Sequence, residues 1–183
     1  MANYQQEVAA RHNLPFAIGF GAGYKLGKHR IHFSAEWYDA VARYNVMDTE
    51  SFTAQSNGEE YNNLVDSELK SIVNYGFGAE FYLKEHLKFF VSYATDFSTS
   101  ILDTRTNLSV STWDVYHLSG GASFQIGRSE ITFGLNYAFG SEKLKGPVKI
   151  PEREIANDLV DLLENSDLDY NRLKFLIGFS FQI

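Results

Sequence analysis

The sequence predicts an all-β protein, an antiparallel up-and-down transmembrane β-barrel built from about seven long strands. Three observations support this fold class. The stretch 172–183 alternates large apolar residues with small or polar ones over its whole length, which is the period of a β-strand. Six earlier segments alternate in the same way, and short and long connections follow one another between them. The composition is rich in aromatic residues (15%) and contains only 3 Pro.

The strands are predicted in chain order at 14–26, 30–39, 71–83, 87–96, 112–126, 130–140 and 172–183. The second extends toward Val46, with a bulge near Asp39 where the alternation blurs. Short turns at 27–29, 84–86 and 127–129 alternate with long loops at 48–70, 97–111 and 141–171. Residues 1–13 lack the alternation, so we expect them to end a preceding external loop, unless they hide one further strand.

The length of the strands suits a membrane. Eleven residues that rise about 3.3 Å each, at a tilt near 40°, span roughly 28 Å, and the apolar band of an outer-membrane barrel is about 25 Å tall. No run of about 18 apolar residues occurs, which excludes a helical span. Aromatic residues gather toward the loop ends, where an interfacial belt is expected. They are Trp37, Tyr75, Tyr93, Tyr116 and Tyr137.

A soluble β-sandwich or lipocalin-like barrel is the alternative, because its strands also alternate. Its polar face would be a solvated surface rich in charged residues. The polar face predicted here consists mainly of Gly, Ala, Ser and Asn, as in Ala17, Gly19, Gly21 and Gly23 of the first strand. Such small residues suit the crowded inside of a curved wall better than a solvent face, so the pattern favours the membrane barrel.

The odd strand number predicts an incomplete barrel. If the last strand ends on the periplasmic side, all short turns lie on that side and the first strand starts outside. Complete single-chain barrels have an even number of strands, so 14–183 is expected to be the C-terminal part of a larger barrel. The first residues also lack the basic and apolar regions of a signal peptide. Export would therefore require a removed signal or a longer chain.

Two resemblances add to this interpretation. The closing residues resemble the β-signal read by the barrel assembly machinery, with Gly178, Phe181 and Ile183 at its glycine and hydrophobic positions. The hairpin segments Gly76–Tyr82 and Leu118–Phe124 resemble the C-terminal half of the fatty-acid and aromatic-hydrocarbon transporters (FadL-type barrels). That family resemblance implies a fourteen-stranded barrel in the outer membrane of a Gram-negative cell, with passive uptake of hydrophobic or amphiphilic small molecules. A non-transporting barrel, an anchor or partner in a secretion or surface-assembly system, is the alternative.

Polar residues with lumen parity are the candidate site. They would contact a passing solute or pair with one another across neighbouring strands. They are His32, Glu36, Asn74, Glu80, Lys88, Asp96, His117, Asn136, Arg172 and Lys174. His117 and Ser119 form a near pair of base and nucleophile of the kind that chance produces, so no enzyme is predicted. The glycines between Gly19 and Gly23 repeat every two residues with no helix after them, unlike a nucleotide loop.

The acidic excess lies in two long loops. Asp48–Lys70 has a net charge of −5 and Ser141–Asn171 of −4, against −7 for the whole chain, so the remainder is about +2. These acids are either solvated or bridged by divalent ions to lipopolysaccharide phosphates. The segment 151–166 predicts an amphipathic helix with Ile155, Leu159, Leu162 and Leu163 on one face. It would pack over the barrel rim or form an external lip for an apolar ligand.

The partners expected from these interpretations are outer-membrane lipid and lipopolysaccharide, the barrel assembly machinery and a hydrophobic small-molecule cargo. The chain has no Cys, so it offers no disulfide and no thiolate zinc site. We expect no cofactor, no metal site and no nucleic acid.

Overall fold

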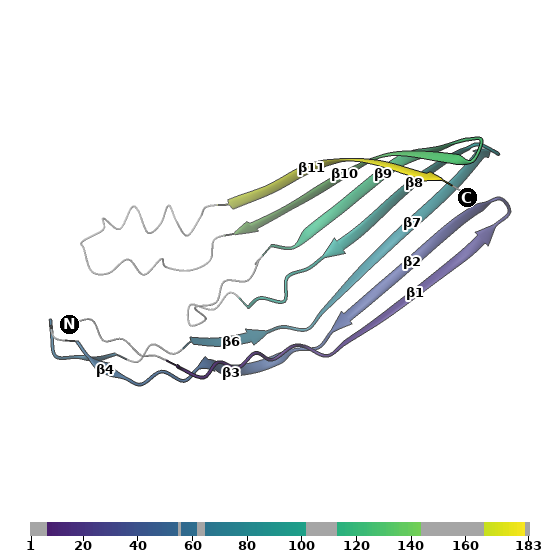
Figure 1. Cartoon of the computed structure of the whole chain (residues 1–183). Coiled ribbons are helices and arrows are strands. Elements are labelled where there is room, and N and C mark those ends of the chain that lie inside the picture. Colours follow the sequence, from purple (N-terminus) through teal and green to yellow (C-terminus); the bar gives the residue numbers. More distant parts are fainter. Residues whose placement is uncertain (1–6, 55, 62–64, 102–112, 144–166, 182–183) are drawn as a thin grey trace.

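The computed structural model describes residues 7–54, 56–61, 65–101, 113–143 and 167–181. They form an all-β protein whose main element is one antiparallel sheet of seven strands, in the order β1-β2-β7-β8-β9-β10-β11 (Figure 1). The strands are β1 (Ala17–Leu26), β2 (His29–Tyr38), β7 (Ile72–Lys84), β8 (Leu87–Asp96), β9 (Val115–Ile126), β10 (Ser129–Lys143) and β11 (Asp167–Phe181). This confirms the seven long antiparallel strands expected from the alternation.

Register keeps the seven strands in phase. One row of facing residues crosses the whole sheet through Gly23, His32, Gly78, Ser92, Ser119, Asn136 and Lys174. All seven are small or polar. Because side chains alternate between the two faces with a period of two, an in-phase register gathers most of the large apolar residues of the seven strands on one face and most of the small and polar residues on the other.

The apolar face is not covered by any other part of the described chain. The side chains of Phe175 and Ile177 are 76% and 78% exposed, and large apolar residues of all seven strands are exposed with them. Among the described residues the buried hydrophobic ones are Ile72 and Ala138 alone. The main sheet therefore has no internal hydrophobic core of the usual kind.

An aromatic band crosses the apolar face near the loop ends of the strands. The ring of Tyr93 lies 6.2 Å from that of Tyr75 and 6.4 Å from that of Tyr116, and Tyr116 lies 5.5 Å from Phe139. These four rings belong to β7, β8, β9 and β10. Tyr137 also reaches the band, because its ring lies 5.5 Å from that of Phe139. The register thus joins separate aromatic residues into one stripe.

The short turns have two residues each, one fewer than expected. Gly27-Lys28 and Gly127-Arg128 begin with a glycine at φ 61° and 60°, a backbone conformation that costs a glycine little and that tight hairpins require. The third turn, Glu85-His86, contains no glycine. Its hairpin instead has a register irregularity between Tyr82 and Lys84.

The predicted long loop 48–70 contains strands, which corrects that expectation. β3 (Val41–Met47) pairs with β6 (Val65–Leu69), and β4 (Phe52–Thr53) pairs with β5 (Glu60–Tyr61). In Figure 1, β3 and β6 lie beyond the loop ends of β2 and β7, outside the main sheet, and run at an angle to them. The predicted extension of the second strand toward Val46 is instead the separate strand β3, in another sheet. Periodicity misses β4, β5 and β6 because they are only two, two and five residues long and the β3–β6 register shifts twice.

The boundaries of other predicted segments also shift. β10 and β11 pair as far as Lys143 and Asp167, so the last long loop is shorter at both ends than 141–171. Ladder hydrogen bonds extend these strands after the apolar alternation has ended. Residues 7–13 lie beside β3, through a bridge between Ala10 and Met47. The predicted helix at 151–166 and the terminal Ile183 lie outside the described residues.

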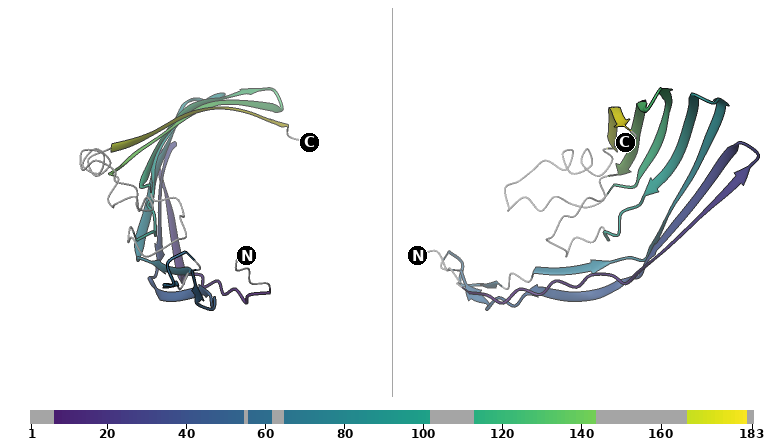
Figure 2. Two further views of the ribbon diagram at one scale, coloured as in Figure 1. Left: turned by 90° about the vertical axis from the view of Figure 1, so that its left-hand side faces the viewer. Right: turned by 45° about the vertical axis from the view of Figure 1, so that its right-hand side comes forward.

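The main sheet is a curved wall with two free edges. Viewed along the strands it forms an open arc (Figure 2). In the described part of the chain β1 pairs only with β2 and β11 only with β10. No helix in that part is long and apolar enough to span a membrane.

Close contact on the polar face gives a stability prediction. A Cβ atom at Gly121 would lie 2.5 Å from Cζ of Phe90 and still closer to the backbone oxygen of Phe133, whereas one at Gly120 would meet nothing nearer than 3.7 Å. We expect Gly121→Ala to lower the free energy of unfolding by about 1–3 kcal/mol through overpacking. Gly120→Ala is the matched control and should change it little. Urea unfolding in detergent micelles measures both, and equal effects would contradict the packing described here.

Candidate functional site

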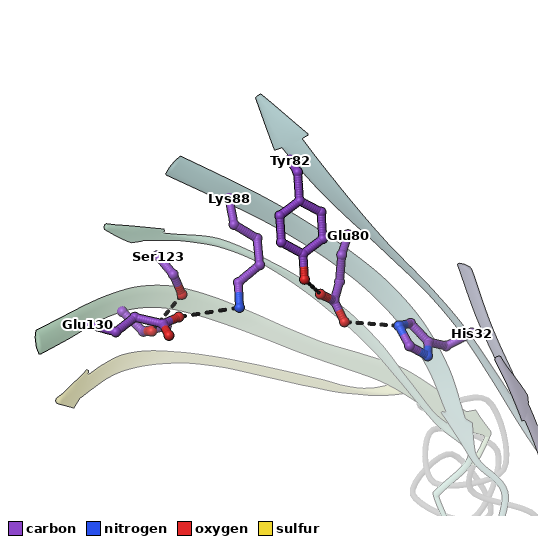
Figure 3. A network of polar contacts seen from close by, with 7 residues as sticks. His32, Glu80, Tyr82, Lys88, Ser123 and Glu130 are labelled. Carbon is purple, nitrogen blue, oxygen red and sulfur yellow. Dashed lines mark hydrogen bonds and ion pairs between the residues drawn. The ribbon is translucent and has the colours of Figure 1, made fainter. Parts of the chain in front are cut away.

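A polar network lies on the polar face of the sheet, toward the short-turn ends of the strands. The Glu80 carboxylate of β7 accepts a hydrogen bond from the Tyr82 hydroxyl (2.9 Å) and lies 3.0 Å from Nε2 of His32 on β2. Figure 3 shows these three side chains directed toward one another. Glu80 and Tyr82 are two residues apart on one strand, so the alternation places them on one face, and the ladder brings β2 beside them.

A second part of the network crosses three strands. Nζ of Lys88 on β8 lies 3.3 Å from the Glu130 carboxylate on β10, and the hydroxyls of Ser123 and Thr132 are 2.6 Å apart. Lys88 faces Ser123 of β9 in the ladder. The lysine therefore reaches across the intervening strand, over a position where the side chain is small (Figure 3).

Midway along the strands, Asn136 donates a hydrogen bond from Nδ2 to Oγ of Ser119 (2.8 Å). His117 shares the strand and the face of Ser119, yet no hydrogen bond joins the two side chains in the described structure. The Ser119 hydroxyl is instead a partner of the neighbouring strand β10. The hydrogen bond between Asn136 and Ser119 is therefore a contact between the neighbouring strands β10 and β9.

At the long-loop end of the sheet, hydrogen bonds to side chains replace the backbone ladder between β7 and β8. The last facing pair is Gly76 and Ala94, although both strands continue. Beyond it, the Tyr75 amide donates to Oγ1 of Thr95 (3.0 Å) and the Phe97 amide donates to Oδ1 of Asn74 (2.7 Å). These bonds satisfy backbone groups that the diverging strands leave without partners.

Two hollows adjoin this region. One of about 370 Å³ is lined by Gly19, Ser34, Glu36, Asn74, Gly76 and Ala94 with their neighbours. Glycine makes room there, because a Cβ at Gly19 would meet only Glu36, at 3.9 Å. The other, of about 250 Å³, is lined by Tyr38, Asn74, Asp96, Trp113 and residues beside them. In both small hollows a solute group would meet amide, hydroxyl and carboxylate groups beside apolar side chains.

The remaining predicted residues are not joined to the network. The Arg172 guanidinium lies 5.7 Å over the ring of Tyr170, its neighbour on the edge strand β11. Lys174 faces Asn136 across the β10–β11 ladder. Of the assembly-signal residues, Gly178 faces Thr132 on the polar side, and Phe181, 59% exposed, faces Ser129.

The sequence alone did not select Tyr82, Ser123, Glu130 and Thr132 as members of the site. Their alternation indicates the correct face, but it says nothing about which residues of neighbouring strands meet. The two-residue turn of the β9–β10 hairpin fixes a register that places Thr132 opposite Ser123. The contact of Lys88 with Glu130 also requires the β8–β9 register, which a long connection leaves undetermined in the sequence.

No group of three or more histidine or acidic side chains in the described residues could hold a metal ion. Comparison of the chain with protein-family models, with curated proteins and with solved structures found no match.

Glu80 contacts both His32 and Tyr82, so its removal should disturb this network more than the loss of a residue with one contact. We expect Glu80→Ala to lower the free energy of unfolding by about 1 kcal/mol, because it leaves the His32 ring and the Tyr82 hydroxyl without their shared acceptor. Glu85→Ala, in the adjacent turn, should have almost no effect. Urea titration of both variants in neutral detergent measures the difference, and a Glu85 effect as large as that of Glu80 would count against the network.

Proposed function

We propose that the chain is part of an outer-membrane β-barrel that lets hydrophobic or amphiphilic small molecules pass. The observation that carries the proposal is the apolar face. Its large side chains are exposed along all seven strands and no other described element covers them. Monomeric soluble proteins rarely expose an apolar surface of this extent, whereas a lipid bilayer covers it without further protein.

The polar face would then line the lumen. Strands that alternate apolar-out and polar-in are what a membrane barrel requires, and the in-phase register provides that arrangement across the whole sheet. The aromatic band from Tyr75 to Phe139 lies where an interfacial girdle is expected. The resemblance to FadL-type barrels supports the choice of a hydrophobic or amphiphilic cargo.

Closure of the barrel belongs to this proposal. β1 and β11 each present one edge with unpaired backbone groups, and such groups cannot remain exposed within a bilayer. Additional strands on both edges would satisfy them, and a total of fourteen agrees with the family resemblance. The acidic loops would lie outside the cell, where divalent ions could bridge them to lipopolysaccharide, and the C-terminal strand would be presented to the barrel assembly machinery.

The pairing on the polar face favours a second candidate function. His32 with Glu80, and Lys88 with Glu130, satisfy one another within the wall, which is what a rigid barrel that carries no solute would need. Such a barrel would anchor a secretion or surface-assembly system or act as its partner.

A pair of adjacent substitutions tests the placement in a membrane. Val91, 52% exposed on the apolar face, and Ser92 on the polar face lie next to each other on the central strand β8. Arginine at a lipid-facing midplane position costs about 2–4 kcal/mol. We expect Val91→Arg to destabilise the chain by that amount in lipid vesicles, and Ser92→Arg to do so much less. In a water-exposed face Val91→Arg would be nearly neutral, and that result would contradict the proposal.

Uptake itself separates the two candidate functions. In vesicles that contain the full chain, we expect a fluorescent single-chain amphiphile with a sulfonate head to enter several-fold faster than in empty vesicles. Gly19→Leu, which fills the 370 Å³ hollow, should slow this entry, and Ala22→Leu, on the opposite face of the same strand, should not. Entry no faster than in empty vesicles, with the chain correctly folded, would favour the anchor.

A further inference from the structure

A notch separates the two hairpin tips formed by β1–β2 and β7–β8. The β2–β7 ladder ends at Arg30 and Glu80, and β7 continues to Lys84 without a partner on that side. In this unpaired part of β7, the backbone amide of Tyr82 points toward β2 and donates a hydrogen bond to the side-chain Nδ1 of His29 (3.3 Å). The stagger leaves a hollow of about 590 Å³, lined by Lys25, Gly27, Lys28, Arg30, Tyr82, Leu83, Lys84 and Glu85.

The notch is strongly basic in an acidic protein. Four of its eight lining residues are cationic and one is acidic, whereas the whole chain has a net charge of −7. In the described structure none of these four cations has a carboxylate partner. Arg30 is the clearest case: it faces Glu80 in the ladder, but that carboxylate binds His32 and Tyr82. The guanidinium lies instead 5.8 Å over the Tyr82 ring.

The surroundings of the notch are amphiphilic. Leu83 is one of its lining residues, and its side chain is 55% exposed on the apolar face. Leu26, at the tip of the neighbouring hairpin, is 59% exposed on that face. An apolar surface therefore begins directly beside the group of cations. A ligand that fits both would have a compact anionic head and an apolar tail.

We propose that this notch binds the phosphate head group of an anionic membrane lipid, with an acyl chain against Leu83 and the apolar face. The inference rests on the proposed function, because it requires the apolar face to lie in lipid. Lysine and arginine are the side chains that bind phosphate, and basic pockets between membrane-spanning elements are known places for lipid head groups. A free anion would use the cations but would gain nothing from Leu83.

The test measures lipid binding to the full chain in neutral maltoside micelles by native mass spectrometry. The probes are phosphatidylglycerol and phosphatidylcholine with identical acyl chains. We expect the first to bind more tightly, and this preference to shrink as the salt concentration rises. The triple variant K25Q/R30Q/K84Q should weaken phosphatidylglycerol binding about 10- to 30-fold, at roughly 3-fold for each partly screened cation.

Two matched variants keep the outcome decisive. Arg128→Gln removes a cation from the other glycine-containing turn, outside the notch, and should leave binding unchanged. K25R/K84R keeps the charges and should retain the preference, which separates loss of charge from loss of folding. An equal loss in Arg128→Gln, or equal binding of both lipids by the unmodified chain, would overturn the proposal. So would inorganic phosphate alone binding as tightly as the lipid.

The result is independent of solute uptake. Binding in micelles requires neither a bilayer nor transport, so an anchor that carries no solute would still bind the lipid. Conversely, a chain that carries solute and shows no preference for the anionic lipid would refute the notch alone.

Discussion

Six antiparallel ladders hold the seven strands in one common register, and both faces of the sheet depend on it. A slip of one residue in any ladder would exchange the faces of the next strand and bring its apolar side chains among the polar ones. The glycine-containing turns Gly27-Lys28 and Gly127-Arg128 help to prevent such slips, because a two-residue turn allows one register only.

The side chains of the two faces are stabilised in different ways. On the polar face the Glu80 carboxylate contacts His32, and Lys88 forms an ion pair with Glu130. Small residues such as Ser123 and Gly121 let long side chains pass over them. On the apolar face, by contrast, no described part of the chain covers the exposed side chains. Burial of its exposed side chains would contribute about 25 cal/mol for each Å² removed from water, and only something outside the described chain can supply that burial.

Charge is distributed unevenly between the two ends of the wall. Acidic residues are concentrated in the long connections, where Arg43 lies 3.5 Å and 3.3 Å from carboxylate oxygens of Asp66 and Glu68 in the β3–β6 ladder. Cations gather at the short turns, and those of the notch have no such partners. The two ends of the strands therefore present opposite charges to their surroundings, and the basic end coincides with the staggered hairpin tips.

The sequence by itself determined the seven long strands of the main sheet, their antiparallel order and the face on which their residues lie, because all three follow from an alternation of period two interrupted by turn residues. It also indicated that His32, Glu80 and Lys88 share one face. Only the tertiary structure decided which of them meet, since contacts such as Lys88 with Glu130 depend on register across strands far apart in the chain. The short strands β4, β5 and β6 and the basic notch were likewise not evident in the pattern. The former lack a clean alternation, and the latter arises from the unequal lengths of two neighbouring strands, a property that no single strand possesses.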